Sequence, residues 1–304
     1  MDFSFTEAQD AIRDTLSRLC AKYDVDYWRT RDAEGGMPEN FVAEIANGGW
    51  LGIAMPEEYG GAGLGVTEAA IMMQTIAESG AAMSGASAIH IAIFGLNPVV
   101  VFGTEDQKRR ALPPLIAGAD RACFGVTEPN AGLDTSKIET RAVLDNGSGD
   151  WVVHGRKIWT TTAQTATKIL LLARTTPIDQ SDRPTDGLSL FYTDFDRDRI
   201  EVREIEKMGR KAVDSNMVFI DGLRIPPEDL IGEEGKGFSY ILHGFNPERI
   251  LVAAEAVGIG RLALARATEY AKEREVFGRP IGKNQAIQHP LAESWAELAA
   301  IDLM

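Results

Sequence analysis

Apolar residues recur at helical spacing through the first part of the chain. Residues 6–23 and 38–47 each place apolar side chains on one helical face, and two glycines follow the second segment. Residues 66–83 and 86–102 are longer, rich in Ala, Ile and Met, and also helical in pattern. We therefore predict an all-helical unit over residues 1–119.

Two short motifs predict where helices of this unit begin. Thr6 and Gln9 have the spacing of a capping box, in which a hydroxyl and an amide satisfy the free N–H groups at a helix start. Thr104 and Gln107 repeat that spacing after a glycine. We expect helices to begin directly after both threonines.

The pattern changes near residue 122. From there to about residue 231, short apolar runs bounded by Asp, Gly and Pro alternate with turns, as is typical of strands. The clearest runs are residues 151–155, 169–173, 188–192 and 217–220. Residues 120–232 are therefore predicted to form a β domain.

Helical spacing returns after residue 237 and continues to Met304. About two helices fit in residues 233–304, and two helices do not bury their own apolar faces, so an incomplete helical bundle is expected. Residues 258–263 match a loose dinucleotide-binding fingerprint. Because no strand precedes them, the glycines there predict close helix packing instead.

Composition narrows the class of protein. The 304 residues include 45 acidic and 31 basic side chains, for a net charge of −14, which disfavours nucleic acid as the main partner. The two cysteines do not form a disulfide framework, and we expect neither a signal peptide nor a membrane span, so a cytoplasmic location is predicted. The four histidines lack zinc-site spacing, so no metal is expected.

Four segments, in order, resemble signatures of the acyl-CoA dehydrogenase family. They are residues 125–134 (GVTEPNAGLD), 155–161 (GRKIWTT), 208–238 beginning MGRK, and 274–287 beginning REVFG. The resemblance covers essentially the whole chain. It implies an α+β fold of the acyl-CoA dehydrogenase type: an N-terminal helical domain, a middle β-barrel-like domain and an incomplete C-terminal helical bundle.

The resemblance also implies FAD as the cofactor, bound between the last two domains. Val126 and Thr127 would face the pyrimidine edge of the flavin, Thr161 its N5 region, and Trp159 would pack against the ring. Gly132 would allow the phosphates to approach the backbone, and Phe124 would also contact the cofactor.

Residues near the end of the chain resemble those that reach a neighbouring subunit's FAD in this family. Arg274 would face the pyrophosphate, since its planar guanidinium suits that group, and Phe277, Ile281 and Asn284 would also contact the cofactor. A homodimer or homotetramer follows from this reading. The alternative is an exposed helical arginine paired with a neighbouring glutamate.

Glu248 is the candidate catalytic base. In the isovaleryl-CoA and long-chain branches of the family, a glutamate just before an arginine removes the proton α to the thioester, and Glu248 followed by Arg249 occupies that place. Phe245, Asn246 and Arg249 would line the path of the pantetheine arm. The alternative is a first-turn glutamate favoured by the helix dipole after Pro247.

The expected reaction is therefore α,β-dehydrogenation of an acyl-CoA thioester, with electrons passed to an electron-transferring flavoprotein. Two departures leave alternatives open: Leu133 replaces a hydroxyl residue of the first signature, and family members continue beyond the place of Met304. The chain could instead be a non-catalytic or fragmentary subunit that pairs with a full-length relative. It could also be a flavin oxidase or monooxygenase of the same fold.

Overall fold

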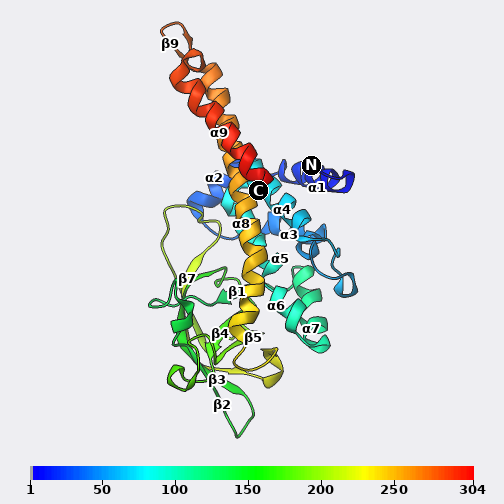
Figure 1. Ribbon diagram of the computed structural model, residues 1–304, viewed down its shortest axis with the longest axis vertical. Helices are drawn as coiled ribbons and strands as arrows, with labels where there is room; N and C mark the ends of the chain where they lie inside the picture. The colour runs from blue at the N-terminus through cyan, green and yellow to red at the C-terminus, as the bar shows by residue number, and fades with distance from the viewer. Residues whose placement is uncertain (1–2) are drawn as a thin grey trace.

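The computed structural model describes residues 3–304 and shows a helical body, a β domain below it and a long helical hairpin that extends above it (Figure 1). The body contains α1 (Glu7–Cys20), α2 (Val25–Glu34), α3 (Glu39–Asn47), α4 (Val66–Ile76), α5 (Ala82–Phe94), α6 (Asn97–Phe102) and α7 (Glu105–Ile116). The predicted fold class is confirmed, with helices, then strands, then helices along the chain.

Both predicted capping boxes are present. The backbone N–H of Gln9 donates to the Thr6 hydroxyl at 3.2 Å, and the Thr6 N–H donates to the Gln9 side chain at 3.0 Å. The Thr104 and Gln107 pair makes the same two bonds at 2.8 and 3.2 Å. Helices α1 and α7 therefore begin directly after their threonines, as the sequence predicts.

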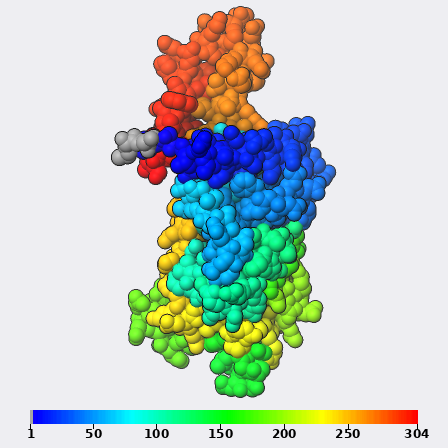
Figure 2. All heavy atoms as spheres, turned by 90° about the vertical axis from the view of Figure 1, so that its right-hand side faces the viewer, coloured from blue at the N-terminus to red at the C-terminus, as the bar shows by residue number. Residues whose placement is uncertain are grey.

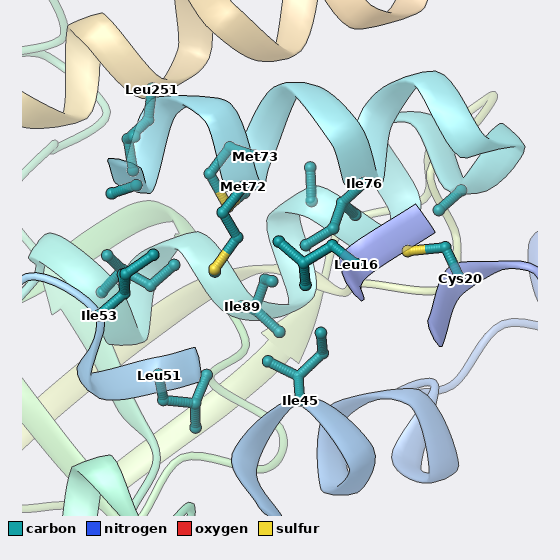
Figure 3. Close-up of a cluster of buried hydrophobic side chains, with 14 of the residues drawn as sticks. Leu16, Cys20, Ile45, Leu51, Ile53, Met72, Met73, Ile76, Ile89 and Leu251 are labelled. Carbon is teal, nitrogen blue, oxygen red and sulfur yellow. The ribbon is translucent and has the colours of Figure 1, made fainter. Parts of the chain in front are cut away.

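The core of the helical body is built around α4 and α5. Leu16, Ile45, Met72 and Ile89 are fully buried there, and they point toward one another from different helices (Figure 3). Leu251, from the distant helix α8, completes the same cluster. The apolar helix faces predicted from the sequence therefore pack against one another in this core.

The long apolar stretch from residue 66 to 102 differs from the two unbroken helices predicted for it. It breaks at a π-helical turn, Ala77–Ala81, where Gly80 has a φ of 107° and Ala82 a φ of 47°. These left-handed conformations end α4 and turn the chain into α5. Helix α2 was not predicted, because it is mostly polar and buries only Trp28.

By length and composition, Val66–Phe102 is also the one stretch in residues 3–304 that is apolar enough to cross a membrane. However, 67% of its most apolar window is buried inside the protein. It is packed as a core element of the helical body.

The β domain is one eight-stranded sheet in the order β6-β7-β3-β2-β4-β5-β8, with β1 paired to β4 in parallel. Its strands are β1 (Ala122–Gly125), β2 (Arg141–Leu144), β3 (Trp151–Thr161), β4 (Lys168–Arg174), β5 (Leu188–Asp194), β6 (Ile200–Glu204), β7 (Ser215–Ile225) and β8 (Leu230–Ile231). All four apolar runs selected from the sequence lie in strands.

The C-terminal part is a helical hairpin. Helix α8 (Gly237–Glu273) is 37 residues long and runs from the β domain across the helical body (Figure 1). Two short strands, β9 (Glu275–Val276) and β10 (Arg279–Pro280), turn the chain back into α9 (Gln285–Leu303). The tip of this hairpin stands clear of the body (Figure 2).

Gly258 explains part of how α8 packs. A Cβ added there would lie 2.4 Å from the backbone oxygen of Gln74 in α4. Residues 258–263 lie inside α8, so they do not form a dinucleotide-binding turn. Close packing of α8 on α4 requires the glycine at 258, as the sequence indicated.

We predict that Gly258→Ala lowers the free energy of unfolding by about 1–3 kcal/mol, because the new methyl group overlaps a backbone oxygen that has no room to move. Chemical denaturation measures this change. Gly209→Ala is the control, since a Cβ at Gly209 meets nothing within 4 Å. Equal stability of the two variants would contradict the close packing of α8 on α4.

Candidate active site

The first two signature segments lie side by side in the β domain. The N–H of Ile158, in β3, donates to the carbonyl oxygen of Thr127 at 2.9 Å. This bond places the segment after β1 next to the end of β3. Residues that are about 30 positions apart in sequence thus form one surface.

A buried ion pair joins these two segments. The Lys157 ammonium donates to Glu128 Oε1 at 2.8 Å and to the carbonyl oxygens of Val126 and Leu172 at 3.1 and 2.8 Å. Lys157 is fully buried and Glu128 nearly so. All three ammonium hydrogens are therefore used, which is what a buried charge requires.

The Glu128 carboxylate also has hydrogen-bond partners besides Lys157. It accepts hydrogen bonds from the backbone N–H groups of Glu139 and Thr140 at 2.6 and 2.9 Å. Burial opposes its ionisation, but Lys157 and these N–H donors outweigh burial and lower the pKa of Glu128. Burial also lowers the pKa of Lys157, to about 8, which still leaves it charged at pH 7.

Sequence reasoning gave Glu128 and Lys157 no role. One sequence signal could have pointed to them: both are charged residues inside signature segments, and neither was needed for catalysis or flavin binding. Their role here is to fix the backbone at Val126 and Thr127, two of the predicted flavin contacts.

Trp159 projects from a distorted part of β3. The register of β3 against β7 shifts between Lys157 and Thr160, and Trp159 has a left-handed φ of 61°. A left-handed conformation is unfavourable for so bulky a residue, by roughly 1–2 kcal/mol. The bulge turns the indole outward, so that 58% of this large ring is exposed.

The surroundings of Trp159 fit a flat ring with hydrogen-bonding edges. Thr127 and Thr161 are half-buried, and their hydroxyls have no hydrogen-bond partner within residues 3–304. The neighbouring Thr160 hydroxyl is buried and also unpaired. An exposed indole beside unpaired hydroxyls matches what an isoalloxazine needs on its face and edges.

The other predicted cofactor residues of the β domain are placed as follows. Val126 is buried and Phe124 half-buried, and Phe124 packs against Gly95, directly after α5. A Cβ at Gly132 would meet nothing within 4 Å, so the turn there faces open space. Leu133, where the family has a hydroxyl, is fully exposed.

Glu248 lies well inside α8, 11 residues after the helix begins at Gly237. The alternative of a first-turn glutamate is therefore wrong. Burial is the largest cause that raises the pKa of this half-buried carboxyl, and Glu255 also raises it, while His90 and Arg249 oppose the rise. A partly buried glutamate whose pKa is raised, on the helix that packs against α5, is a candidate for a general base.

The residues flanking Glu248 are more exposed. Arg249 donates to Asn246 Oδ1 at 2.9 Å, and both side chains face solvent. Phe245 is half-buried and packs against the core between the helical body and the β domain. Helix α5 contacts both β1 and α8, so Phe124 and Glu248 flank the same helix.

The structure does not bring Arg274 and Phe277 to Trp159 within one chain. They lie at the tip of the α8–α9 hairpin, at the opposite end of the molecule from β2 and β3 (Figure 1). Phe277 is 101% exposed and has a left-handed φ of 53°. Nearby, Asn284 accepts a hydrogen bond from Arg279 at 2.8 Å, and Ile281 is half-buried.

Known proteins match every part of this chain. Residues 6–119, 123–223 and 235–304 match the sequence profiles of the acyl-CoA dehydrogenase N-terminal, middle and C-terminal domains, respectively. The acyl-CoA dehydrogenase fadE12 of Mycobacterium bovis is 32% identical over 314 aligned residues, which cover 100% of this chain and 77% of that protein.

Solved structures of known proteins also superpose on almost the whole chain. Butyryl-CoA dehydrogenase from Megasphaera elsdenii superposes with a TM-score of 0.91 at 30% identity, over 99% of this chain and 78% of that one. A chain from a structure described as the electron transferring flavoprotein of Acidaminococcus fermentans gives 0.92 at 31% identity, over 99% and 77%.

The fold and these matches define a flavoprotein oxidoreductase that acts on acyl-CoA. The chain belongs to the acyl-CoA dehydrogenase family.

We predict that Lys157→Met lowers the free energy of unfolding by about 3–5 kcal/mol, because the Glu128 carboxylate is left buried without its cation. Urea unfolding at pH 7 measures this loss. Lys272→Met is the matched control: Lys272 pairs with Glu269 at 2.7 Å on the surface, where both side chains are exposed. A loss no larger than that of the control would show that the pair is not needed for folding.

Proposed function

We propose that this chain binds FAD and catalyses the α,β-dehydrogenation of an acyl-CoA thioester, with Glu248 as the base. The observation that supports this most directly is the Glu248 carboxyl itself, half-buried within α8 and with its pKa raised by burial. Removing the α-proton of a thioester needs a carboxylate whose pKa is tuned toward the working pH.

In this proposal the β domain holds the flavin. Trp159 would pack against the ring, and the unpaired hydroxyls of Thr127 and Thr161 would bond to its edges, next to the backbone at Val126. Phe124 and Gly132 complete the contact. Bound FAD would supply the acceptor for the hydride that leaves the β-carbon of the substrate.

The chain's own residues orient the thioester. Glu248 takes the α-proton onto its carboxylate, which lies on α8, the helix that packs against α5. Phe245, Asn246 and Arg249 line the path of the pantetheine arm, and the exposed Arg249 and Asn246 are free to meet its polar groups.

A second copy of this chain completes the cofactor site. Near the hairpin tip, beyond the end of α8, lie Arg274, Phe277, Ile281 and Asn284, too far from their own β domain to serve it (Figure 1). A fully exposed phenylalanine at such a tip is suited to burial against another subunit. The proposal therefore includes a homodimer or homotetramer.

Electrons pass on to an electron-transferring flavoprotein, and we place the enzyme in the cytoplasm. The likeness to a chain from an electron-transferring flavoprotein structure supports the choice of acceptor. A near-stoichiometric flavin band in the purified protein distinguishes the enzyme from a non-catalytic subunit. Oxygen uptake during turnover would indicate an oxidase instead.

We predict that Glu248→Gln lowers kcat by about 10²- to 10⁴-fold, the usual contribution of a positioned general base. The bound flavin, followed by its visible band, stays in place because the amide keeps the shape of the side chain. Glu269→Gln, on the exposed surface of the same helix, is the control and keeps full activity. Turnover by Glu248→Gln at the wild-type rate would remove Glu248 from the mechanism.

The pH dependence of kcat/KM provides a separate prediction. Because burial raises the pKa of Glu248 above the ordinary value of 4.5, the base becomes protonated at a higher pH than a free glutamate. We expect kcat/KM to fall as the pH decreases through this raised pKa. An acidic limb at or below pH 4.5 would contradict the assignment.

A further inference from the structure

The bulge in β3 that carries Trp159 needs support from outside its own strand. The register of β3 against β7 shifts between Lys157 and Thr160, so that two residues of β3 face the single residue Met217 of β7. A bulge of this kind interrupts the hydrogen-bonded ladder and bends the strand. The left-handed φ of 61° at Trp159 adds strain at the same place. Such strain persists only where neighbouring groups enforce it.

Asn216, at the start of β7, supports the end of the bulge. Its side-chain Nδ2 donates to the carbonyl oxygen of Thr160 at 2.9 Å, and Asn216 itself is 0% exposed. Nδ2 also donates to the Asp214 carboxylate, and Oδ1 accepts from the Gln164 side chain at 3.0 Å. Both amide hydrogens and the amide oxygen are therefore used, which fixes the orientation of the Asn216 side chain.

Asp214 holds the residues that follow the bulge. Its carbonyl oxygen accepts from the Thr162 N–H at 3.4 Å, and its carboxylate accepts from the Gln164 N–H at 3.2 Å. Thr162, like Trp159, has a left-handed φ, of 63°. Because Asn216 holds the carbonyl group of Thr160, the backbone is fixed on both sides of Thr161.

The other end of the bulge is tied to a different segment. The Ile158 N–H donates to the Thr127 carbonyl oxygen at 2.9 Å, beside the buried Lys157. Trp159 therefore lies between two tethered residues, Ile158 and Thr160, while 58% of Trp159 remains exposed. The strand is anchored at both ends of the position from which the indole projects.

We propose that Asn216 is a positioning residue for the cofactor: through the Thr160 carbonyl it holds the bulge so that the Trp159 indole and the Thr161 hydroxyl are in place before the flavin arrives. This inference rests on the proposed function, in which FAD binds at Trp159. Asn216 is fully buried, so it acts through the backbone and not by touching the flavin.

A fixed surface suits a flat, rigid ligand. If the indole and the hydroxyl are already in place, binding does not have to order them, and more of the contact energy appears as affinity. A role of Asn216 in folding alone predicts a different result. Stability would then fall on substitution, but the folded protein would present Trp159 unchanged and bind FAD as before.

The first test examines Trp159 without any cofactor. In fluorotryptophan-labelled apo-protein, the resonance of Trp159 is the one of five that disappears in Trp159→Phe. We expect Asn216→Ala to shift or broaden this resonance in fluorine NMR and to leave the other four in place. An unchanged Trp159 resonance overturns the proposal.

The second test measures the affinity of the apo-protein for FAD, at a temperature where every variant is folded. We expect Asn216→Ala to raise the Kd for FAD about tenfold, comparable to the loss of one buried hydrogen bond. An unchanged Kd overturns the proposal even if the resonance moves, because the bulge would then not prepare the flavin contact.

Gln107→Ala is the matched control. Gln107 is also a buried amide that joins two segments: it donates to the carbonyl oxygens of Glu228 and Leu230, each at 2.8 Å. We expect this variant to lose stability while the Trp159 resonance and the Kd for FAD stay at their wild-type values. Equal changes in both variants would show a general loss of stability and overturn the proposal.

Failure of the proposed function gives a different result. If wild-type apo-protein binds no FAD, the proposed function is wrong, and this inference falls with it whatever the Trp159 resonance does. If wild type binds FAD and Asn216→Ala binds it equally well, the proposed function stands and the role of Asn216 alone is wrong.

Gln164→Ala replaces Asn216→Ala if the latter does not fold. The Gln164 side chain is exposed, so its loss does not endanger folding, and it is the donor to the Asn216 amide oxygen. We expect the Trp159 resonance to move in the same direction and the Kd for FAD to rise about threefold, as for a weaker hydrogen bond. If either quantity stays at its wild-type value, the proposal is overturned.

Discussion

Close packing along α8 determines how the rest of the molecule is arranged. Glycines stand where other elements approach the helix most closely: a Cβ at Gly237 would lie 2.4 Å from the Leu190 nitrogen in β5, and one at Gly258 2.4 Å from the Gln74 oxygen in α4. Between these contacts, Gly244 faces Pro98 of α6. One helix thereby locks the β domain and the helical body together and carries Glu248 and Glu255 between them.

The candidate cofactor surface depends on a different interaction. The buried Lys157–Glu128 pair ties the segment after β1 to β3, so that Val126 and Thr127 lie on a fixed backbone. Trp159 lies in a bulge that begins directly after Lys157. Rigid support directly beside a strained, outward-facing tryptophan is the arrangement expected where a ligand is held, because the strain persists only if the surroundings enforce it.

The ionisation of Glu248 results from opposing effects. Burial and the second carboxylate, Glu255, disfavour the charged form, while His90 and Arg249 favour it. A base needs both influences: enough burial to raise its pKa toward neutrality, and enough positive charge to keep it ionised when substrate arrives. Helix α5 supplies His90, and it also contacts β1, which links the environment of the base to the β domain.

The sequence alone determined that helices are followed by strands and then by helices, and it located both capping boxes and the strands β3, β4, β5 and β7, because these follow from local spacing and side-chain chemistry. It also located the signature segments and Glu248. Only the tertiary structure decided the break at Gly80, the outward turn of Trp159, and the burial of Lys157 against Glu128 and of His90 against Glu255. Those features arise where distant segments meet, and the sequence pattern within one segment does not show which charge will be buried against which partner.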